Sequence, residues 1–239
     1  MKRLATICAR GGSKGVPNKN LKLLGGRPLI AWSVLQAKAT GLFDRVVVSS
    51  DSGDIRAAAL EAGADSVVNR PTDMATDEAP KVPAILHALL EAEREANVRY
   101  DVLVDLDATA PLRLPDDIIG AVDLLETSGS RSVITGNEAY RSPYFDLVEL
   151  QDDGTVRVSK TPSRPVFRRQ DVPVCYDMNA SIYVWKRDAL VANPSVFYGD
   201  TRLFEMPAER SREIDSPFDF SIVEFLFDRL KIANVLSQQ

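Results

Sequence analysis

Short apolar runs alternate with amphipathic helical patterns over the first 137 residues of this chain. Such alternation favours an α/β fold built on a doubly wound, mostly parallel, Rossmann-like sheet. Ligands of these sheets bind beyond the carboxyl ends of the strands. We expect strands at Leu4–Ala9, Arg45–Ser49, Asp65–Val68, Val102–Leu106 and Ser132–Thr135, and helices at Pro28–Ala39, Asp51–Ala62, Pro83–Glu95 and Pro115–Thr127.

The pattern changes from about residue 140. Tyr144–Leu150 and Thr155–Ser159 flank Asp152-Asp153-Gly154, which predicts a hairpin. A strand at Ser181–Trp185 and a helix at Pro217–Leu230 follow. We expect residues 1–239 to form a single domain, with 140–175 as an insertion. Because the insertion is too small for a core of its own, it should cover a site or pack on a second subunit.

Composition excludes several classes of protein. Of the 239 residues 45% are hydrophobic and 26% charged, as in an ordinary globular protein, and the net charge of −5 argues against a nucleic-acid partner. No apolar run reaches the roughly 18–20 residues of a membrane span. The apolar stretch before Arg10 is short for a secretory signal, and two cysteines make no metal or disulfide pattern. We expect a cytoplasmic protein without a membrane partner.

The chain has one histidine, His87, in an apolar helical stretch. A catalytic triad or a histidine-rich zinc site therefore has almost no ligands to draw on. Any chemistry must rest on Arg, Lys, Asp, Glu and backbone amides.

The segment Arg10–Asn20 follows the first predicted strand and combines three glycines with the cations Arg10, Lys14 and Lys19. Glycines let backbone amides approach a ligand closely, and the cations add charge-assisted hydrogen bonds, so the loop suits a polyphosphate. It matches neither the dinucleotide fingerprint nor the P-loop. The alternative is a basic surface turn.

Two acidic segments are further candidates for the functional site. Asp105–Arg113 ends a strand with two carboxylates, although acidic residues are also common in turns. Glu213 and Asp215 share one face of an extended segment, as two ligands of Mg²⁺ would. In a compatible alternative, Asp215 or Ser216 caps the helix that begins at Pro217.

A basic stretch, Lys160–Gln170, includes Arg168 and Arg169, which could clamp a phosphate or a carboxylate. It could equally be a solvated, charged hairpin.

These segments, in this order, resemble the acylneuraminate cytidylyltransferases (CMP-sialic acid synthetases), with their legionaminic and pseudaminic acid relatives, over nearly the whole chain. The specific motif is Arg-x-x-Ser-Lys-Gly-x-Pro-x-Lys-Asn, present as residues 10–20. The resemblance implies a nucleotidyltransferase sheet, a dimerisation segment near 140–170, Mg²⁺ as cofactor, a homodimer and a role in cell-surface glycan biosynthesis.

The resemblance also implies roles for individual residues. Arg10, Lys19 and Asp215 would be catalytic, and Asp215 with Glu213 would bind the metal. The nucleotide would be bound by Arg10, Gly11, Gly12, Ser13, Lys14, Asn20 and Arg70. The sugar acid would be bound by Asp107, Thr109, Arg113, Arg169, Gln170 and Asn179.

Three positions depart from the family pattern. Asp107 stands where many sialic acid enzymes have Gln, and we expect this carboxylate to repel or reorient an acidic substrate. Glu213 stands where Asp is common, and Asp177 where some members carry Arg. These departures point away from ordinary sialic acid.

We therefore expect transfer of CMP from CTP to the anomeric hydroxyl of a nine-carbon 2-keto sugar acid, with release of pyrophosphate. Two alternatives are a nucleotidyltransferase for another sugar acid or a sugar phosphate, and a non-catalytic CTP-binding paralogue. A purely structural protein would not need a glycine-rich cationic loop.

Overall fold

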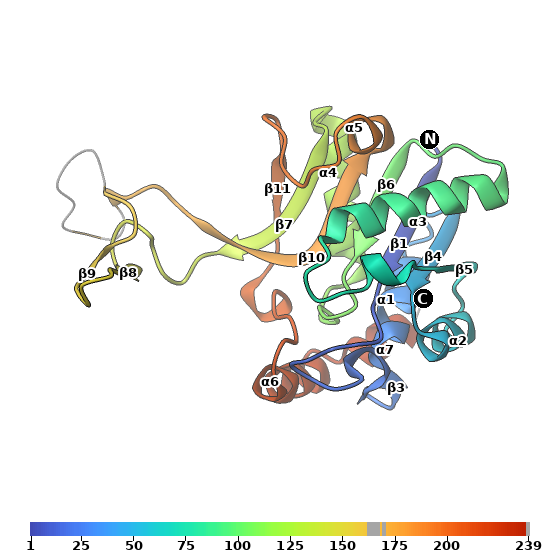
Figure 1. Ribbon diagram of the computed structural model, residues 1–239, viewed down its shortest axis with the longest axis horizontal. Helices are drawn as coiled ribbons and strands as arrows, with labels where there is room; N and C mark the ends of the chain where they lie inside the picture. The colour runs from blue at the N-terminus through green and yellow to red at the C-terminus, as the bar shows by residue number, and fades with distance from the viewer. Residues whose placement is uncertain (162–167, 169–170, 238–239) are drawn as a thin grey trace.

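The computed structural model describes residues 1–161, 168 and 171–237. Within them the main sheet has seven strands in the order β11-β7-β10-β6-β1-β4-β5 (Figure 1). Neighbouring strands run parallel except β10, which is antiparallel to both β6 and β7. The strands are β1 (Arg3–Cys8), β4 (Arg45–Ser50), β5 (Ser66–Asn69), β6 (Val102–Leu106), β7 (Ser132–Glu138), β10 (Tyr176–Lys186) and β11 (Arg202–Glu205).

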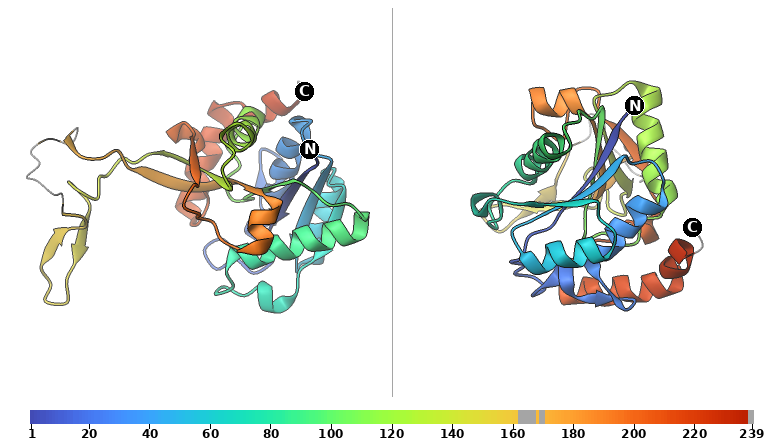
Figure 2. Two further views of the ribbon diagram at one scale, coloured as in Figure 1. Left: turned by 90° about the horizontal axis from the view of Figure 1, so that it is seen from above. Right: turned by 90° about the vertical axis from the view of Figure 1, so that its right-hand side faces the viewer.

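Helices cover both faces of the sheet, as the predicted doubly wound fold requires (Figure 2). One core joins β1, β4 and β6 to α1 (Leu29–Ala39), α2 (Gly53–Glu61) and α4 (Pro115–Ser128). The opposite core joins the sheet to α3 (Lys81–Ala96) and α5 (Arg187–Ala192). A third cluster packs α6 (Pro217–Arg229) and α7 (Ile232–Ser237) on the outer side of α1.

The helix starts follow from local chemistry. The Ser52 hydroxyl accepts from the Ile55 amide at the start of α2, and Ser216 forms a capping box with Asp219 before Pro217 at the start of α6. Pro28 is the residue before α1 instead of its first helical residue. The sequence patterns did not predict α5, β11, α7 or the short pair β2 (Leu23–Leu24) and β3 (Arg27–Pro28).

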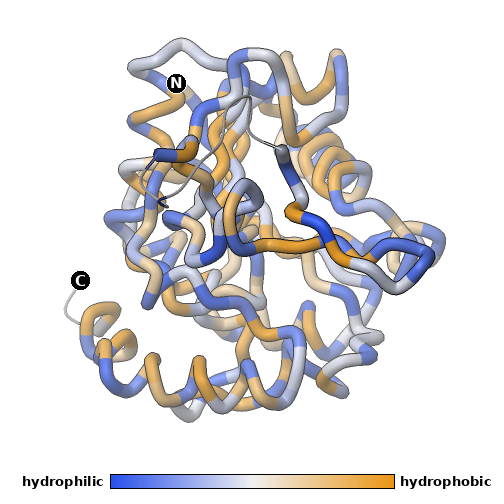
Figure 3. Tube along the Cα trace, turned by 90° about the vertical axis from the view of Figure 1, so that its left-hand side faces the viewer, coloured by the Kyte–Doolittle hydropathy of each residue, from blue (hydrophilic) through white to orange (hydrophobic). Residues whose placement is uncertain are grey.

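An arm projects from the body between β7 and β10 (Figure 1). It carries the predicted hairpin, as the two-stranded sheet β8 (Val148–Leu150) and β9 (Val156–Val158). Val148 pairs with Val158 and Leu150 with Val156, so these four side chains share one face of the hairpin, and all are exposed. Hydrophobic and hydrophilic segments alternate along the arm, which points toward the viewer in Figure 3.

Short elements complete the connections: η1 (Lys19–Leu21), η2 (Thr72–Met74) and η4 (Ala208–Arg210). None of the helices in the described part of the chain has the length and apolar character that crossing a membrane requires.

Candidate active site

The loop after β1 is fixed to its surroundings at two glycines. The Gly11 amide donates to Asp51 Oδ1 (2.9 Å), at the end of β4. A Cβ on Gly15 would lie 2.0 Å from the carbonyl oxygen of Asp215, so only glycine lets the loop pass this close to the acidic segment. The fold therefore brings two of the predicted motifs, about 200 residues apart, into direct contact.

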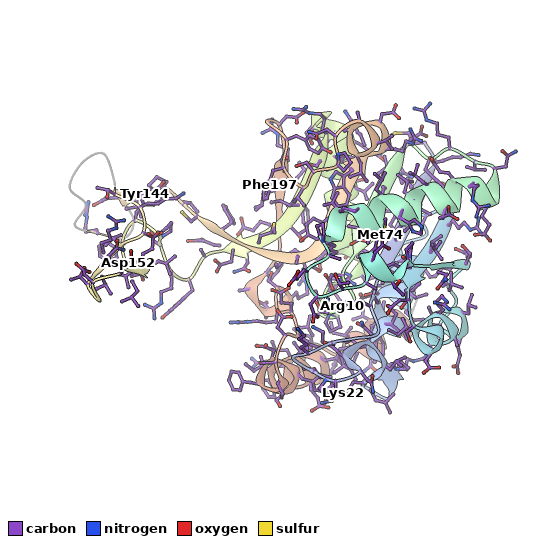
Figure 4. The ribbon with its side chains drawn as sticks, viewed as in Figure 1. Arg10, Lys22, Met74, Tyr144, Asp152 and Phe197 are labelled. Atoms are coloured by element: carbon purple, nitrogen blue, oxygen red, sulfur yellow. The ribbon has the colours of Figure 1, made fainter. Side chains whose placement is uncertain are left out.

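A cavity of about 270 Å³ opens beside this loop, and we refer to it as the loop cavity. Residues from the β1 loop, the β5–α3 connection and the end of β6 form its walls. Arg10 and Met74 lie close together there, far from Tyr144 and Asp152 on the arm (Figure 4). The predicted site residues that line it are Arg10, Ser13, Lys19, Asn20, Arg70, Asp107 and Thr109.

Internal contacts hold two of its cations in place. Lys19, nearly buried, donates to the carbonyl oxygen of Ile214 and lies 3.2 Å from Asp215 Oδ1. Arg70, also buried, donates from Nη2 to the Ser49 carbonyl (2.9 Å). Their positive ends are therefore placed by the fold before any ligand arrives.

Arg10 and Lys14 instead share a partner from the loop opposite. Asp77 lies 2.6 Å from Arg10 Nη2 and 2.6 Å from Lys14 Nζ, and Arg10 Nη1 also donates to the Thr76 carbonyl (2.6 Å). Hydrogen bonding from Lys14, with the charges of both cations, lowers the pKa of Asp77. The Asp77 carboxylate therefore forms ion pairs with the two cations that the sequence analysis assigns to phosphate binding.

Asn20 contributes an acceptor without a donor. Its Nδ2 donates to the Arg10 carbonyl (3.0 Å), whereas its Oδ1 is buried and has no hydrogen-bond partner among the described residues. A buried acceptor with no partner is costly unless a ligand or water supplies a donor.

Arg113 has a structural position beneath the cavity. Its side chain is fully buried and donates to the carbonyls of Asp107, Ala110 and Ser181 and to the Ser33 hydroxyl. It lines neither the loop cavity nor the second cavity described below. The guanidinium therefore shapes the turn that presents Asp107 and Thr109.

Asp107 has a partner that the sequence analysis missed. Lys81, the first residue of α3, places Nζ 2.8 Å from Asp107 Oδ2 and 3.1 Å from the fully buried Asp105. Burial alone would raise the pKa of Asp107, but Lys81 and hydrogen bonds from Thr109 lower it to about 2. The fold thus supplies a cation beside Asp107, which the expectation that this carboxylate repels or reorients an acidic substrate did not include.

The acidic segment before α6 contains the helix cap that the sequence analysis offered as one of its two uses. Ser216 caps the helix, while Glu213 and Asp215 precede it and line a second cavity. Burial, with the charges of Asp215 and Asp107, raises the pKa of Glu213 against the opposing effect of Lys19 and Lys81. A cation placed between these carboxylates would relieve that repulsion.

The second cavity lies where the arm joins the body, and we call it the arm-base cavity. Its lining residues come from β7, β10, η4 and the acidic segment, and Asn179 is among them. Asn179 is itself tied down: Oδ1 accepts from Thr135 Oγ1 (2.7 Å) and Nδ2 donates to Ser211 Oγ (2.9 Å). The lining includes one cation, Arg212, and the carboxylates of Glu138, Asp177, Glu213, Asp215 and Asp219.

No cluster of three or more Asp, Glu, His or Cys able to hold a metal occurs in the residues that the structure describes. The pair Glu213 and Asp215 still fits Mg²⁺, since this ion commonly takes one or two carboxylates and completes its shell with water and phosphate oxygens.

The predicted residues thus fall into groups. The loop and the Asp107 turn meet at the loop cavity, and Glu213, Asp215 and Asn179 meet at the arm-base cavity. The Lys19–Asp215 ion pair joins the two cavities. Gly11, Gly12 and Lys14 do not line either cavity, and Arg169 and Gln170 lie outside the described residues. The sequence analysis missed Lys81 and Asp77, because an isolated Lys or Asp carries no motif.

Sequence comparison identifies a family and several relatives of this chain. The cytidylyltransferase family model matches residues 4–226. The chain is 46% identical to post-translational flagellin modification protein B of Campylobacter coli, over 93% of this chain and 94% of that protein. It is 44% identical to the CMP-N,N'-diacetyllegionaminic acid synthase of Campylobacter jejuni, with the same coverage.

Structural comparison agrees on the fold. CMP:2-keto-3-deoxy-manno-octonic acid synthetase, solved in complex with CTP, superposes with a TM-score of 0.68 at 17% identity, covering 96% of this chain and 99% of that one. At this identity the likeness concerns the architecture of the sheet and its helices.

Proposed function

The chain belongs to the cytidylyltransferase family, and from this premise we propose that it transfers CMP from CTP to the anomeric hydroxyl of a nine-carbon 2-keto sugar acid. The observation that carries the proposal is the contact between the cationic loop and the Glu213–Asp215 pair, joined through Lys19. This arrangement places cations beside the carboxylates that would hold a divalent cation against one ligand's phosphates. It occurs in a chain 44% identical to a CMP-N,N'-diacetyllegionaminic acid synthase.

The loop cavity suits the nucleotide. Arg10, Lys19 and Arg70 supply positive charge around it, and the Asn20 Oδ1 atom offers an acceptor for a sugar hydroxyl. Lys14 lies at the outer edge, where it is exposed and reaches Asp77. Gly12 and Ser13 would provide backbone and hydroxyl donors to the phosphates, and Gly11 would hold the loop in place through its hydrogen bond to Asp51.

Glu213 and Asp215 would hold Mg²⁺, supported by the match between two carboxylates and the ion's preferences and by the raised pKa of Glu213. When bound, the ion neutralises charge on the phosphates and lowers the pKa of a coordinated hydroxyl.

The arm-base cavity suits the acceptor, with Asn179 and the Asp107–Thr109 turn nearby. Its five carboxylates and single arginine suit the hydroxyls of a sugar better than its acid group. We assign that acid group to side chains outside this lining, with the Arg169 guanidinium and the Gln170 amide as the candidates from this chain. Arg113 acts by shaping the turn.

The reaction needs alignment more than covalent chemistry. The anomeric oxygen attacks the α-phosphorus of CTP, the bond from that phosphorus to the bridging oxygen breaks, and pyrophosphate leaves. Arg10 and Lys19 would balance the charge that develops on the phosphates, and the proton of the anomeric hydroxyl is lost to solvent or to a basic oxygen.

The chain works as a homodimer in this proposal. Support comes from the hairpin face made of Val148, Leu150, Val156 and Val158, which nothing covers in the described chain. A two-stranded hairpin is marginal alone, so a second copy is the natural cover. We place the enzyme in the cytoplasm, where CTP is available, with no membrane or nucleic-acid partner.

The test is pyrophosphate release with CTP and Mg²⁺ against N-acetylneuraminic, legionaminic, pseudaminic and eight-carbon sugar acids, with ATP, GTP and UTP as controls. Turnover with CTP and one nine-carbon acid is the expected result, and the legionaminic acid relatives make that acid the first to try. Turnover only with the eight-carbon acid would instead reassign the substrate. CTP binding without Mg²⁺-dependent turnover would favour the non-catalytic alternative.

A further inference from the structure

A chain of contacts runs from Lys81 to the acidic segment. Lys81 Nζ donates to Asp107 Oδ2 (2.8 Å), and Asp107 Oδ1 accepts from both the amide and the hydroxyl of Thr109 (2.8 Å each). The Thr109 carbonyl then accepts from the Ile214 amide (2.9 Å). Three hydrogen-bonded steps thus connect the start of α3 to the residue between Glu213 and Asp215.

Ile214 is held from its other side as well. Its carbonyl accepts from Lys19, and its side chain is fully buried in the cluster with Val16 and Leu112. A backbone fixed at its amide, its carbonyl and its side chain has little freedom. Because Glu213 and Asp215 flank this fixed residue and both line the arm-base cavity, the backbone at Ile214 sets the positions from which their side chains extend.

Lys81 is the one cation that the structure pairs with either Asp105 or Asp107 in the described residues. Asp105 is fully buried, and its other oxygen accepts from Thr6 (2.9 Å). Without Lys81 the two carboxylates would lose their ion-pair partner, and only the charge of the buried Arg113 nearby would still offset theirs. This costly arrangement favours rotation or protonation of one of them. The Tyr183 ring, 4.6 Å from Nζ, restricts where the ammonium can go.

We propose that Lys81 is a positioning residue for the Glu213–Asp215 pair, acting through Asp107, Thr109 and the Ile214 backbone. The inference rests on the proposed function, in which that pair holds the divalent cation. It also explains the departure at residue 107: a carboxylate there is workable because a lysine reaches it, so the two residues form one unit.

The test compares Lys81→Met with Lys81→Arg, and uses Lys38→Met as the matched control. Lys38 also forms an ion pair, with Asp65 (2.5 Å), but on the surface and outside both cavities. Binding of Mn²⁺ in the presence of CTP is followed by loss of the free-ion EPR signal, and the Mg²⁺ concentration for half-maximal turnover is measured in parallel. Circular dichroism checks that each variant is folded.

We expect K81M to weaken Mn²⁺ binding by about 10- to 100-fold, the usual effect of removing a group that orients metal ligands. K81R should lose less than about threefold because a guanidinium can still pair with two carboxylates, and K38M should match the wild type. If K81M does not fold, Thr109→Val, which removes one of the two contacts to Asp107, should still weaken Mn²⁺ binding by a few-fold.

A double-mutant cycle separates action through Asp107 from direct contact with the ligand. In an Asp107→Asn background, adding K81M should cost less than about threefold if the residues form one unit. Unchanged Mn²⁺ binding in K81M, or an equal loss in both backgrounds, would overturn the inference. Wild-type protein that binds Mn²⁺ with CTP but turns over no sugar acid would defeat the proposed function while leaving the Mn²⁺ comparison readable.

Discussion

The loop cavity and the arm-base cavity share the Lys19–Asp215 ion pair but differ in how far one chain completes them. In the loop cavity, Lys19, Arg70 and Lys81 are held by internal partners, and the walls come from elements packed on the central sheet. The arm-base cavity opens beside the projecting arm and has five carboxylates facing one arginine.

This difference shows which part of the site has its charged groups in position before a ligand binds. Charges fixed by a packed fold need no reorganisation when a ligand arrives. In the proposed function, the loop cavity would therefore bind the polyphosphate largely through groups already in place. In the proposed function, the acidic cavity at the base of the arm would need a cation to offset its carboxylates, and the exposed hairpin at the far end of the arm would need a cover from a second chain. The nucleotide half of the proposed site would therefore be built by one chain, and the acceptor half would be completed by other components.

The largest effect should come from Asp215→Asn. Loss of a carboxylate that holds the divalent cation should lower kcat by about 1000-fold or more, while CTP binding measured without metal changes little. Pyrophosphate release and calorimetric titration with CTP measure the two quantities. Retention of more than about a tenth of wild-type kcat would count against the metal role.

The next largest effect should come from substitutions in the arm. Leu150→Asp combined with Val156→Asp puts two charges on the exposed apolar face, and burial of two such side chains corresponds to about 100-fold or more in the dimer dissociation constant. Sedimentation should show monomers at micromolar concentration, and CTP binding should persist. Asp152→Asn, at the hairpin tip, is the matched control. A sedimentation profile unaltered by the double substitution would rule out this face as the interface.

Asp77→Asn should produce a smaller change of the opposite sign. Its carboxylate competes with phosphate for Arg10 and Lys14, so its removal should lower the KM for CTP by about 3- to 10-fold. The gain should shrink at high salt. Glu78→Gln, one residue along the same exposed connection, is the control. A raised KM in D77N would mean that the carboxylate helps to bind the nucleotide.

The smallest effect concerns Glu213 and pH. Burial, with the charges of Asp215 and Asp107, raises its folded-state pKa, so the ionised form destabilises the fold above that pKa. Glu213→Gln should therefore raise the Tm at pH 8 without divalent cations by about 1–3 °C. The difference should shrink as pH falls through the raised pKa and vanish below the ordinary value of 4.5. Thermal unfolding scans measure these Tm values, with Glu224→Gln as the control. A lower Tm for E213Q than for the wild type at pH 8 would contradict the prediction.

Most of the fold could be predicted from the sequence, because strand and helix periods are local. Val46–Val48 and Val102–Leu106 are apolar runs typical of buried strands, and Gly63 follows the helix that ends at Glu61. The direction of β10 and the insertion of β11 at the sheet edge could not, since strand pairing depends on contacts between distant residues.

The sequence by itself determined the chemistry available: a glycine-rich cationic loop, a carboxylate pair and a single histidine, His87, in an apolar helical stretch. Tertiary structure alone decided how these groups combine. It placed the Asp215 carbonyl against Gly15, buried Arg113 under its turn and brought Lys81 to Asp107. The physical reason is that the charge state and reach of a side chain depend on its neighbours in space, and pairs such as Lys19 and Asp215 become neighbours only when the sheet and α6 pack together.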